Sequence, residues 1–294
     1  MDIPNVYLSL GVVGLRGVEV ITVSTMVYMM LKPSEALTRL NDMGVEYVEL
    51  SYDNFQFFRK LGVDYYTLIR DVMDVYRSLK SKVVAAHLPY GDLINRAVNP
   101  SEQPKVINEL SRWLNFFSEI GVKVVASHIP FNYAGIEESS ITYAQRVKEV
   151  NQGFFKKLTE LGRDYGIVIA VENRYERGVY GYLPKDLIDI VDAINDDYLK
   201  YCLDTGHSII NNFQPHEFYK RLHPNVALIH IHDNDGSKDL HLPPYTGVID
   251  WDIFISTLKE LNYNGTTVLE VACSDSLRRC DNIVKLLKMI LNTF

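Results

Sequence analysis

The sequence predicts a (β/α)₈ barrel in one domain spanning residues 1–294, and three observations support this fold. Short β-branched runs alternate with longer amphipathic stretches from about Val18 to the end, which is typical of repeated βα units. The β-branched runs recur roughly every 35 residues, a spacing that suits this barrel. No Pro- or Ser-rich linker interrupts the alternation, so one domain is expected.

The expected strands are short and rich in Val, Ile and Tyr, and the residues between them carry the helical period. Residues 1–17 have no place in the repeat, and we expect there an N-terminal extension or a hairpin that closes the bottom of the barrel. The strands are expected at 19–24, 47–50, 83–87, 122–128, 167–172, 201–204, 226–232 and 267–271. Helices are expected at 34–43, 65–79, 102–120, 142–165, 184–194, 251–261 and 275–291.

Glycines mark the ends of several expected helices. Gly44, Gly62, Gly121 and Gly166 each precede a β-branched residue, and glycine readily takes the left-handed conformation that ends a helix. The main alternative fold is a doubly wound sheet, which shares the βαβ rhythm. That fold usually has a Gly-rich phosphate loop after its first strand, but residues 24–27 contain no glycine. A closed barrel is therefore favoured.

Composition and charge restrict the class of partner. Hydrophobic residues make up 47% of the chain and charged residues 23%, as in a globular protein with a large core. The net charge of −7 gives no global positive field to attract phosphate backbones, so nucleic acid is the less expected partner. The apolar run at 6–15 is too short to span a bilayer and lacks basic residues before it, so we expect neither a membrane segment nor a signal peptide.

The cysteines predict neither a disulfide framework nor a thiolate zinc site. Cys202, Cys273 and Cys280 are odd in number and include no C-x-x-C pair. A cytoplasmic location, where thiols stay reduced, fits this pattern.

Candidate metal ligands gather at the C-terminal ends of the expected strands. Catalytic groups in such a barrel come from those ends, which meet in one cup. Imidazole and carboxylate together suit Zn²⁺, Mn²⁺, Co²⁺ or Mg²⁺, and the nitrogen ligands favour the transition metals. The histidines at or just beyond strand ends are His87, His128, His207, His230, His232 and His241, and the carboxylates are Glu49, Glu172, Asp204 and Glu270.

Alternation along the strands indicates that these side chains point inward. A small residue stands two positions before three of the ligands, and residues two apart share a face. These pairs are Ala85 and His87, Ala126 and His128, and Ala170 and Glu172.

Several candidates also have simple structural explanations. Glu49 is expected to be a salt-bridge partner inside the barrel, and Asp239 lies in a polar loop where turn formation explains it as well as metal does. His216 and His223 are expected to be surface or capping residues of a helical stretch. A single strand-end histidine such as His87 is more often a hydrogen-bonded core residue than a ligand. The joint pattern is what favours a metal site.

The motifs resemble those of the xylose isomerase-like TIM-barrel superfamily, which includes sugar isomerases, sugar epimerases, inosose dehydratases and endonuclease IV. The resemblance covers about residues 18–291, and the Asp-Thr-Gly-His run is its most specific part. The matching segments are His87-Leu88-Pro89-Tyr90, Val171-Glu172-Asn173, Cys202-Leu203-Asp204-Thr205-Gly206-His207, His230-Ile231-His232-Asp233, His241-Leu242-Pro243-Pro244, Ile249-Asp250-Trp251 and Val268-Leu269-Glu270.

The isomerase and epimerase branch implies one divalent cation held by Glu172, Asp204, His232 and Glu270, with His207 facing the substrate. In that branch the two glutamates move protons while the metal stabilises an enediolate. His232 stands at the extreme end of its strand, so we expect it to be the direct ligand and His230 a supporting or substrate-side residue. The implied partner is a small sugar, sugar phosphate or related polyol, and selectivity is expected to depend on side chains such as Tyr90, Arg174 and Trp251.

Two other functions stay open. The endonuclease IV branch cleaves DNA at abasic sites with three zinc ions, while a third possibility is a barrel that binds sugar or metal without turnover. The acidic charge, the loop at 242–247 and the residues at 173–177 favour the sugar branch. The two proton-transfer glutamates argue against a purely binding role. The oligomeric state stays open, and the counterparts of the endonuclease ligands are His87, His128, Glu172, Asp204, His207, His232, Asp239, His241 and Glu270.

Overall fold

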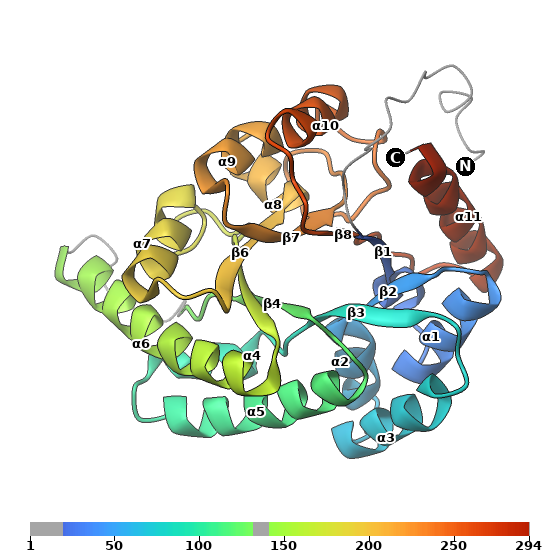
Figure 1. The fold of residues 1–294 in the computed structure, drawn as a ribbon, viewed down its shortest axis with the longest axis horizontal. Helices are drawn as coiled ribbons and strands as arrows, with labels where there is room; N and C mark the ends of the chain where they lie inside the picture. Colours follow the sequence, from blue (N-terminus) through green and yellow to red (C-terminus); the bar gives the residue numbers. More distant parts are fainter. Residues whose placement is uncertain (1–19, 132–140, 294) are drawn as a thin grey trace.

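The computed structural model describes residues 20–131 and 141–293, which form a closed barrel of parallel strands surrounded by helices (Figure 1). Each strand pairs with its neighbours in sequence, and β8 pairs with β1 to close the ring. The predicted (β/α)₈ fold is confirmed. The strands are β1 (Val20–Ser24), β2 (Tyr47–Leu50), β3 (Lys82–His87), β4 (Val124–His128), β5 (Val168–Glu172), β6 (Leu199–Asp204), β7 (Val226–Ile231) and β8 (Thr266–Leu269).

The helices lie outside the ring of strands (Figure 1). Four of the described helices, α1, α5, α7 and α9, have proline in the first turn, where the missing N–H costs no hydrogen bond. The helices are η2 (Thr25–Tyr28), α1 (Pro33–Asp42), α2 (Tyr52–Lys60), α3 (Tyr65–Tyr76), α4 (Asp92–Asn95), η3 (Arg96–Val98), α5 (Gln103–Glu119), α6 (Ile141–Tyr165), α7 (Pro184–Ile194), α8 (Thr205–Ile210), α9 (Pro215–Leu222), α10 (Trp251–Glu260) and α11 (Leu277–Thr293).

Most of the expected elements occur where the sequence predicts them, and the short helices are the main additions. Neither α2 nor α8 appears among the predicted helices. Both are capped by the residue that ends the preceding strand region: Ser51 accepts from Asp53 N, and Asp204 accepts from His207 N. Such caps satisfy amide groups at the start of a helix that is too short to show a clear helical period.

The helix-ending glycines behave as predicted. Gly44, Gly62, Gly121 and Gly166 have φ values of +70°, +93°, +86° and +67°. After α1, Val45 N donates to Leu40 O at 3.0 Å, a bond that only the reversal at the glycine allows. The reversals at Gly44, Gly121 and Gly166 lead toward the next strand, while the one at Gly62 joins α2 to α3.

The barrel interior is packed with small and aliphatic side chains below the strand ends. Ala85, Ala126 and Ala170 are fully buried there, which confirms the inward face predicted from alternation. A separate, larger core of aliphatic and aromatic residues lies between the strands and the helices. The lower part of the barrel is therefore filled with side chains, and the polar groups lie above them at the C-terminal ends of the strands.

Cys273 and Cys280 form a disulfide, so the prediction of no disulfide is wrong. Their Cα atoms lie 5.7 Å apart because the chain turns from the end of β8 into the first turn of α11 over seven residues. A spacing in sequence does not reveal such a turn. The bond also removes the argument that the cysteines gave for a reducing compartment, while Cys202 is a buried free thiol.

Two other expectations concern the ends and surface of the chain. The predicted extension or hairpin at 1–17 lies outside the described residues. Within the described ranges, no helix is both long and apolar enough to cross a bilayer. His223 is the exposed C-cap of α9, as predicted, whereas His216 is half-buried within that helix and does not cap it.

Candidate metal centre

The strand register brings the predicted ligands together. His128 at the end of β4 is paired with Glu172 at the end of β5, and Asp204 at the end of β6 is paired with His230 of β7. Glu270 directly follows β8. Paired residues of parallel strands point to the same side of the sheet, and the closed ring turns that side inward.

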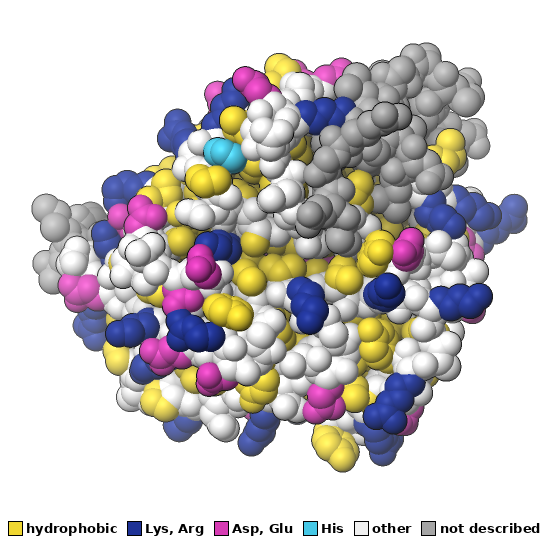
Figure 2. Space-filling model, viewed as in Figure 1, with side chains coloured by type: hydrophobic (Ala, Val, Ile, Leu, Met, Phe, Trp, Pro, Cys, Tyr) yellow, Lys and Arg dark blue, Asp and Glu magenta, His cyan; other side chains and the backbone are white. Residues whose placement is uncertain are grey.

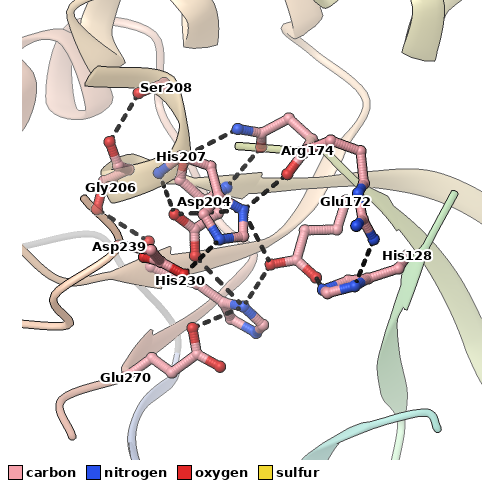
Figure 3. Close-up of polar contacts among 12 residues, drawn as sticks. His128, Glu172, Arg174, Asp204, Gly206, His207, Ser208, His230, Asp239 and Glu270 are labelled. Atoms are coloured by element: carbon pink, nitrogen blue, oxygen red, sulfur yellow. Dashed lines mark hydrogen bonds and ion pairs between the residues drawn. The ribbon is translucent and has the colours of Figure 1, made fainter. Parts of the chain in front are cut away.

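The central group consists of Glu172, Asp204, His230 and Glu270, whose nearest ligand atoms all lie within 4.8 Å of one another. Nδ1 of His230 lies 3.1 Å from Glu172 Oε1, 3.3 Å from Glu270 Oε2 and 4.0 Å from Asp204 Oδ2. Figure 3 shows the carboxylates of Glu172 and Glu270 approaching this imidazole from different sides. The group offers one nitrogen and several oxygens around a single point.

Glu49 orients His230 from the opposite side of the ring. Its Oε1 lies 2.9 Å from His230 Nε2, and both side chains are fully buried. A carboxylate only accepts, so Nε2 donates the hydrogen and the Nδ1 lone pair is left to face the carboxylates of the central group. This is the carboxylate–histidine arrangement that supports metal ligands in proteins. It agrees with the structural role predicted for Glu49.

The buried carboxylates of the centre need positive charge to balance them. Glu49, Glu172, Asp204 and Glu270 are each at most 4% exposed. Arg174 is the only Lys or Arg among the buried residues of the described ranges, and its guanidinium already pairs with Glu176. Buried carboxylates without positive partners are strongly disfavoured, so protons or metal ions must balance them.

A second group, here called the distal group, lies beside the central one. Nδ1 of His207 donates to Asn173 O at 2.8 Å, and Nδ1 of His241 donates to Glu270 O at 3.0 Å. Their Nε2 atoms lie 3.3 and 3.2 Å from Asp239 Oδ2. Each Nε2 of a neutral ring therefore points a lone pair at an oxygen that can only accept. A proton or a cation between them removes this conflict.

The pKa shifts of His207 and Asp204 reflect the same close contacts between imidazoles and carboxylates. Burial lowers the pKa of His207, but Asp204 and Asp239 outweigh burial and raise that pKa to about 10. Burial raises the pKa of Asp204, yet His207 and His232 bring it down to about 2. When a metal site lacks its ion, protons can take the place of the cation. The histidines of such a site are then charged and lie beside ionised carboxylates.

His232 belongs to the distal side of the centre. Its Nε2 lies 3.0 Å from both oxygens of Asp204, and its ring stacks on His241 with centroids 3.9 Å apart. A Cβ on Gly206 would lie 2.0 Å from His232 Cε1, so glycine is required at this point of the Asp-Thr-Gly-His motif. The sequence prediction placed His232 in the central set, whereas the structure brings His230 there.

A third group is formed by His87, His128 and Glu172. The Nε2 atoms of the two histidines lie 3.0 and 3.1 Å from Glu172 Oε2. Nδ1 of His87 donates to Leu88 O at 2.7 Å, but Nδ1 of His128 faces Nη1 of Arg174 at 2.7 Å. Burial, together with the charge of Arg174, lowers the pKa of His128 to about 4. His128 in its neutral form therefore carries its hydrogen on Nε2, whereas both ring nitrogens of His87 face acceptor oxygens.

The other motif residues hold the backbone around the ligands. Asn173 donates to Asp204 O at 3.1 Å and accepts from Asp204 N at 2.8 Å, which locks β5 to β6 at the site. Thr205 donates to His232 O at 2.8 Å and accepts from His232 N at 3.1 Å. These bonds explain why the polar residues adjoin the ligands in sequence.

The three predicted substrate-binding residues have protein partners. Tyr90 donates to Asp53 Oδ1 at 2.5 Å and stacks on His128. Trp251 donates from its indole to Asp233 Oδ2 at 2.8 Å, where Asp233 also accepts from the backbone of the 247–249 loop. Arg174 pairs with Glu176, and its Nη1 faces Nδ1 of His128. Their substrate roles stay predictions.

Sequence reasoning did not single out Asp53, Glu176 or Asp233 as site residues. Asp233 stands directly after the His230-Ile231-His232 run, and Glu176 lies two residues after Arg174. For Asp233, adjacency to a predicted ligand was the available signal. Their partners, however, come from other loops or depend on how the loop folds, so sequence alone does not reveal them.

Comparisons with known proteins agree with this architecture. The family model of the xylose isomerase-like TIM barrel matches residues 37–292. An uncharacterized protein of Methanocaldococcus jannaschii is 25% identical over 253 residues, covering 84% of this chain and 82% of that protein. D-psicose 3-epimerase of Enterocloster bolteae is 23% identical over 224 residues, covering 70% of this chain and 68% of the enzyme.

A solved structure described as a D-tagatose 3-epimerase-like protein has the same fold. It superposes with a TM-score of 0.74 at 23% identity, covering 92% of this chain and 98% of the other. The family match extends over most of the sequence, from within α1 to the end of α11. This chain belongs to the xylose isomerase-like TIM-barrel family.

Proposed function

We propose that this protein is a divalent-metal-dependent isomerase or epimerase acting on a small sugar, sugar phosphate or related polyol. The central group carries the proposal, because two buried glutamates approach one histidine nitrogen from different sides (Figure 3). Glu172, Asp204, His230 Nδ1 and Glu270 would hold the ion. When bound, a divalent cation polarises a substrate carbonyl and stabilises the negative charge that develops on its oxygen.

The two glutamates differ in how strongly they are held. Glu172 Oε2 contacts His87 and His128 at 3.0 and 3.1 Å, and its Oε1 contacts His230 at 3.1 Å. Glu270 Oε2 has longer contacts, 3.3 Å to His230 and 3.7 Å to His241. Glu270 is therefore the better base for the proton on the carbon beside the carbonyl. Glu172 would return a proton on the other side while fixing the ion.

The test is solvent exchange at that carbon. The protein is incubated in D₂O with a divalent metal and a panel of sugars and sugar phosphates, and deuterium next to the carbonyl is measured by NMR. We expect exchange with at least one compound, its loss after chelation, and its loss in Glu270→Gln. Glu260→Gln, at an exposed position on α10, is the matched control and should exchange normally. Exchange that survives in Glu270→Gln would remove the glutamate from the proposed role.

The distal group favours a second candidate, metal-dependent cleavage of a phosphodiester as in the endonuclease IV branch. His207, Asp239 and His241 lie beside the central group, and adjacent metal ions commonly stabilise both oxygens in phosphoester hydrolysis. Charge argues against a DNA duplex as substrate. The net charge of the chain is −7. Acidic and basic side chains are interspersed on the one face that Figure 2 shows.

One comparison separates the two candidates. A duplex with an abasic site is offered to the same metal-loaded preparation, and strand cleavage is followed on a denaturing gel. Nicking that is lost in Asp239→Asn, without deuterium exchange into any compound of the panel, would establish the phosphodiesterase and reject the isomerase. Exchange without nicking would establish the isomerase.

A further inference from the structure

The strongest observation outside the two groups used above concerns Arg174, an arginine buried among the candidate ligands. Its side chain is 7% exposed. Nε and Nη2 donate to the two carboxylate oxygens of Glu176 at 2.9 and 2.5 Å, and the guanidinium carbon lies 4.3 Å from the ring centroid of Phe131. The planar guanidinium is thus fixed by a bidentate ion pair and by stacking, which leaves Nη1 directed at His128 (Figure 3).

The contact between Arg174 and His128 decides which nitrogen of the histidine carries hydrogen. Nη1 lies 2.7 Å from Nδ1, and a guanidinium can only donate. Nδ1 must therefore accept, so the hydrogen of the neutral imidazole is on Nε2. Nε2 lies 3.1 Å from Glu172 Oε2, which is a suitable acceptor.

Turning the ring over does not remove this constraint. A rotation of the imidazole by half a turn would place carbon atoms against both Arg174 and Glu172, and both polar contacts would be lost. The ring of Tyr90 also stacks on His128, with centroids 4.8 Å apart and planes 25° apart, which disfavours tilting. His87 is the contrast within the same group, because both of its ring nitrogens face acceptors, Leu88 O at 2.7 Å and Glu172 Oε2 at 3.0 Å.

We propose that Arg174 is a positioning residue that holds His128 as a hydrogen-bond donor to Glu172, and that it thereby removes the group of His87, His128 and Glu172 from metal binding. A histidine binds metal through an unprotonated nitrogen. His128 could do so through Nε2 while still accepting from Arg174 only as the imidazolate anion. The residues of this group therefore do not fit the third ion that the resemblance to endonuclease IV implies.

The inference rests on the metal centre of the proposed function and refines it. Ions are expected in the central and distal groups only. Glu172 Oε2 then accepts a hydrogen bond from His128 and is not shared between two ions. This keeps Glu172 aligned toward the central group.

Nitrogen NMR and metal content together test this inference. Protein with ¹⁵N-labelled histidine is recorded with and without zinc, and His128 is assigned from its absence in His128→Gln. We expect unprotonated Nδ1 and protonated Nε2 in both states. His128→Gln should keep the wild-type number of zinc ions per chain. The paired variant Arg174→Leu with Glu176→Gln, which removes both charges together, should bind one additional ion at saturation, because the freed His128 can then offer Nε2.

Arg174→Lys is the matched control, since an ammonium also only donates, and it should keep the wild-type spectrum and metal content. A protonated Nδ1, loss of one ion in His128→Gln, or an unchanged ion count in a folded paired variant would each overturn the inference. The spectrum of metal-free wild-type protein needs neither a bound ion nor a variant. It therefore decides the role of Arg174 even if the chain binds no metal and the proposed function fails.

Discussion

Replacing Glu49 by leucine tests whether this carboxylate tunes the central group. Glu49 accepts one hydrogen bond from His230 Nε2 at 2.9 Å, and neither side chain is exposed. A hydrogen bond to a charged group contributes about 1.5–3 kcal/mol, and leucine would leave a buried N–H without a partner. If the metal-bound state is destabilised by this amount and the metal-free state is not, the zinc dissociation constant rises by about 10- to 100-fold. This is the usual effect of removing a residue that hydrogen-bonds to a metal ligand.

The assay is a competition titration of zinc against a fluorescent chelator, with circular dichroism to confirm the fold. Glu49→Gln keeps an accepting oxygen without the charge, so its loss of affinity should lie between wild type and Glu49→Leu. Glu160→Gln, at an exposed position on α6, controls for the removal of a carboxylate elsewhere. Wild-type affinity in a folded Glu49→Leu variant would show that His230 is not a ligand oriented by Glu49.

Three further predictions concern stability. Gly206→Ala should destabilise the fold by about 1–3 kcal/mol in urea unfolding, because its Cβ would lie 2.0 Å from His232, whereas Gly153→Ala in α6 meets nothing within 4 Å and should be neutral or stabilising. Removing metal with a chelator should lower Tm, and zinc should restore it, since an ion at 100 times its dissociation constant stabilises by about 2.7 kcal/mol. Unchanged Tm in both directions would contradict a metal centre. Arg39 holds the pKa of Asp281 below its usual value, so this pair stabilises above the ordinary carboxyl pKa and the effect is lost as pH falls through the folded pKa. Asp281→Asn should therefore lower stability at neutral pH by about 1 kcal/mol, given the partial exposure of the pair, and the difference should vanish in acid.

The sequence by itself determined the barrel and the inventory of polar groups in its cup. Alternation with a period of two fixes which strand residues point inward, so the order of residues along β5 is enough to assign Ala170 and Glu172 to one face. The glycines at Gly44 and Gly121 likewise indicate helix ends through a conformation that other residues rarely adopt. These signals are local, because each depends only on neighbours along the chain.

The tertiary structure decided which of these polar residues lie together in the central group and which lie in the distal group. His230 and His232 share a strand face, but the register of β6 against β7 pairs His230 with Asp204 and carries His232 past the strand end to the distal side. Closure of the ring sets Glu49 of β2 against His230 of β7, a contact between residues 181 positions apart. The hydrogen on His128 depends on the loop that folds Arg174 back onto it. Contacts of this kind arise from strand stagger and loop path, which a single sequence does not encode in any short-range pattern.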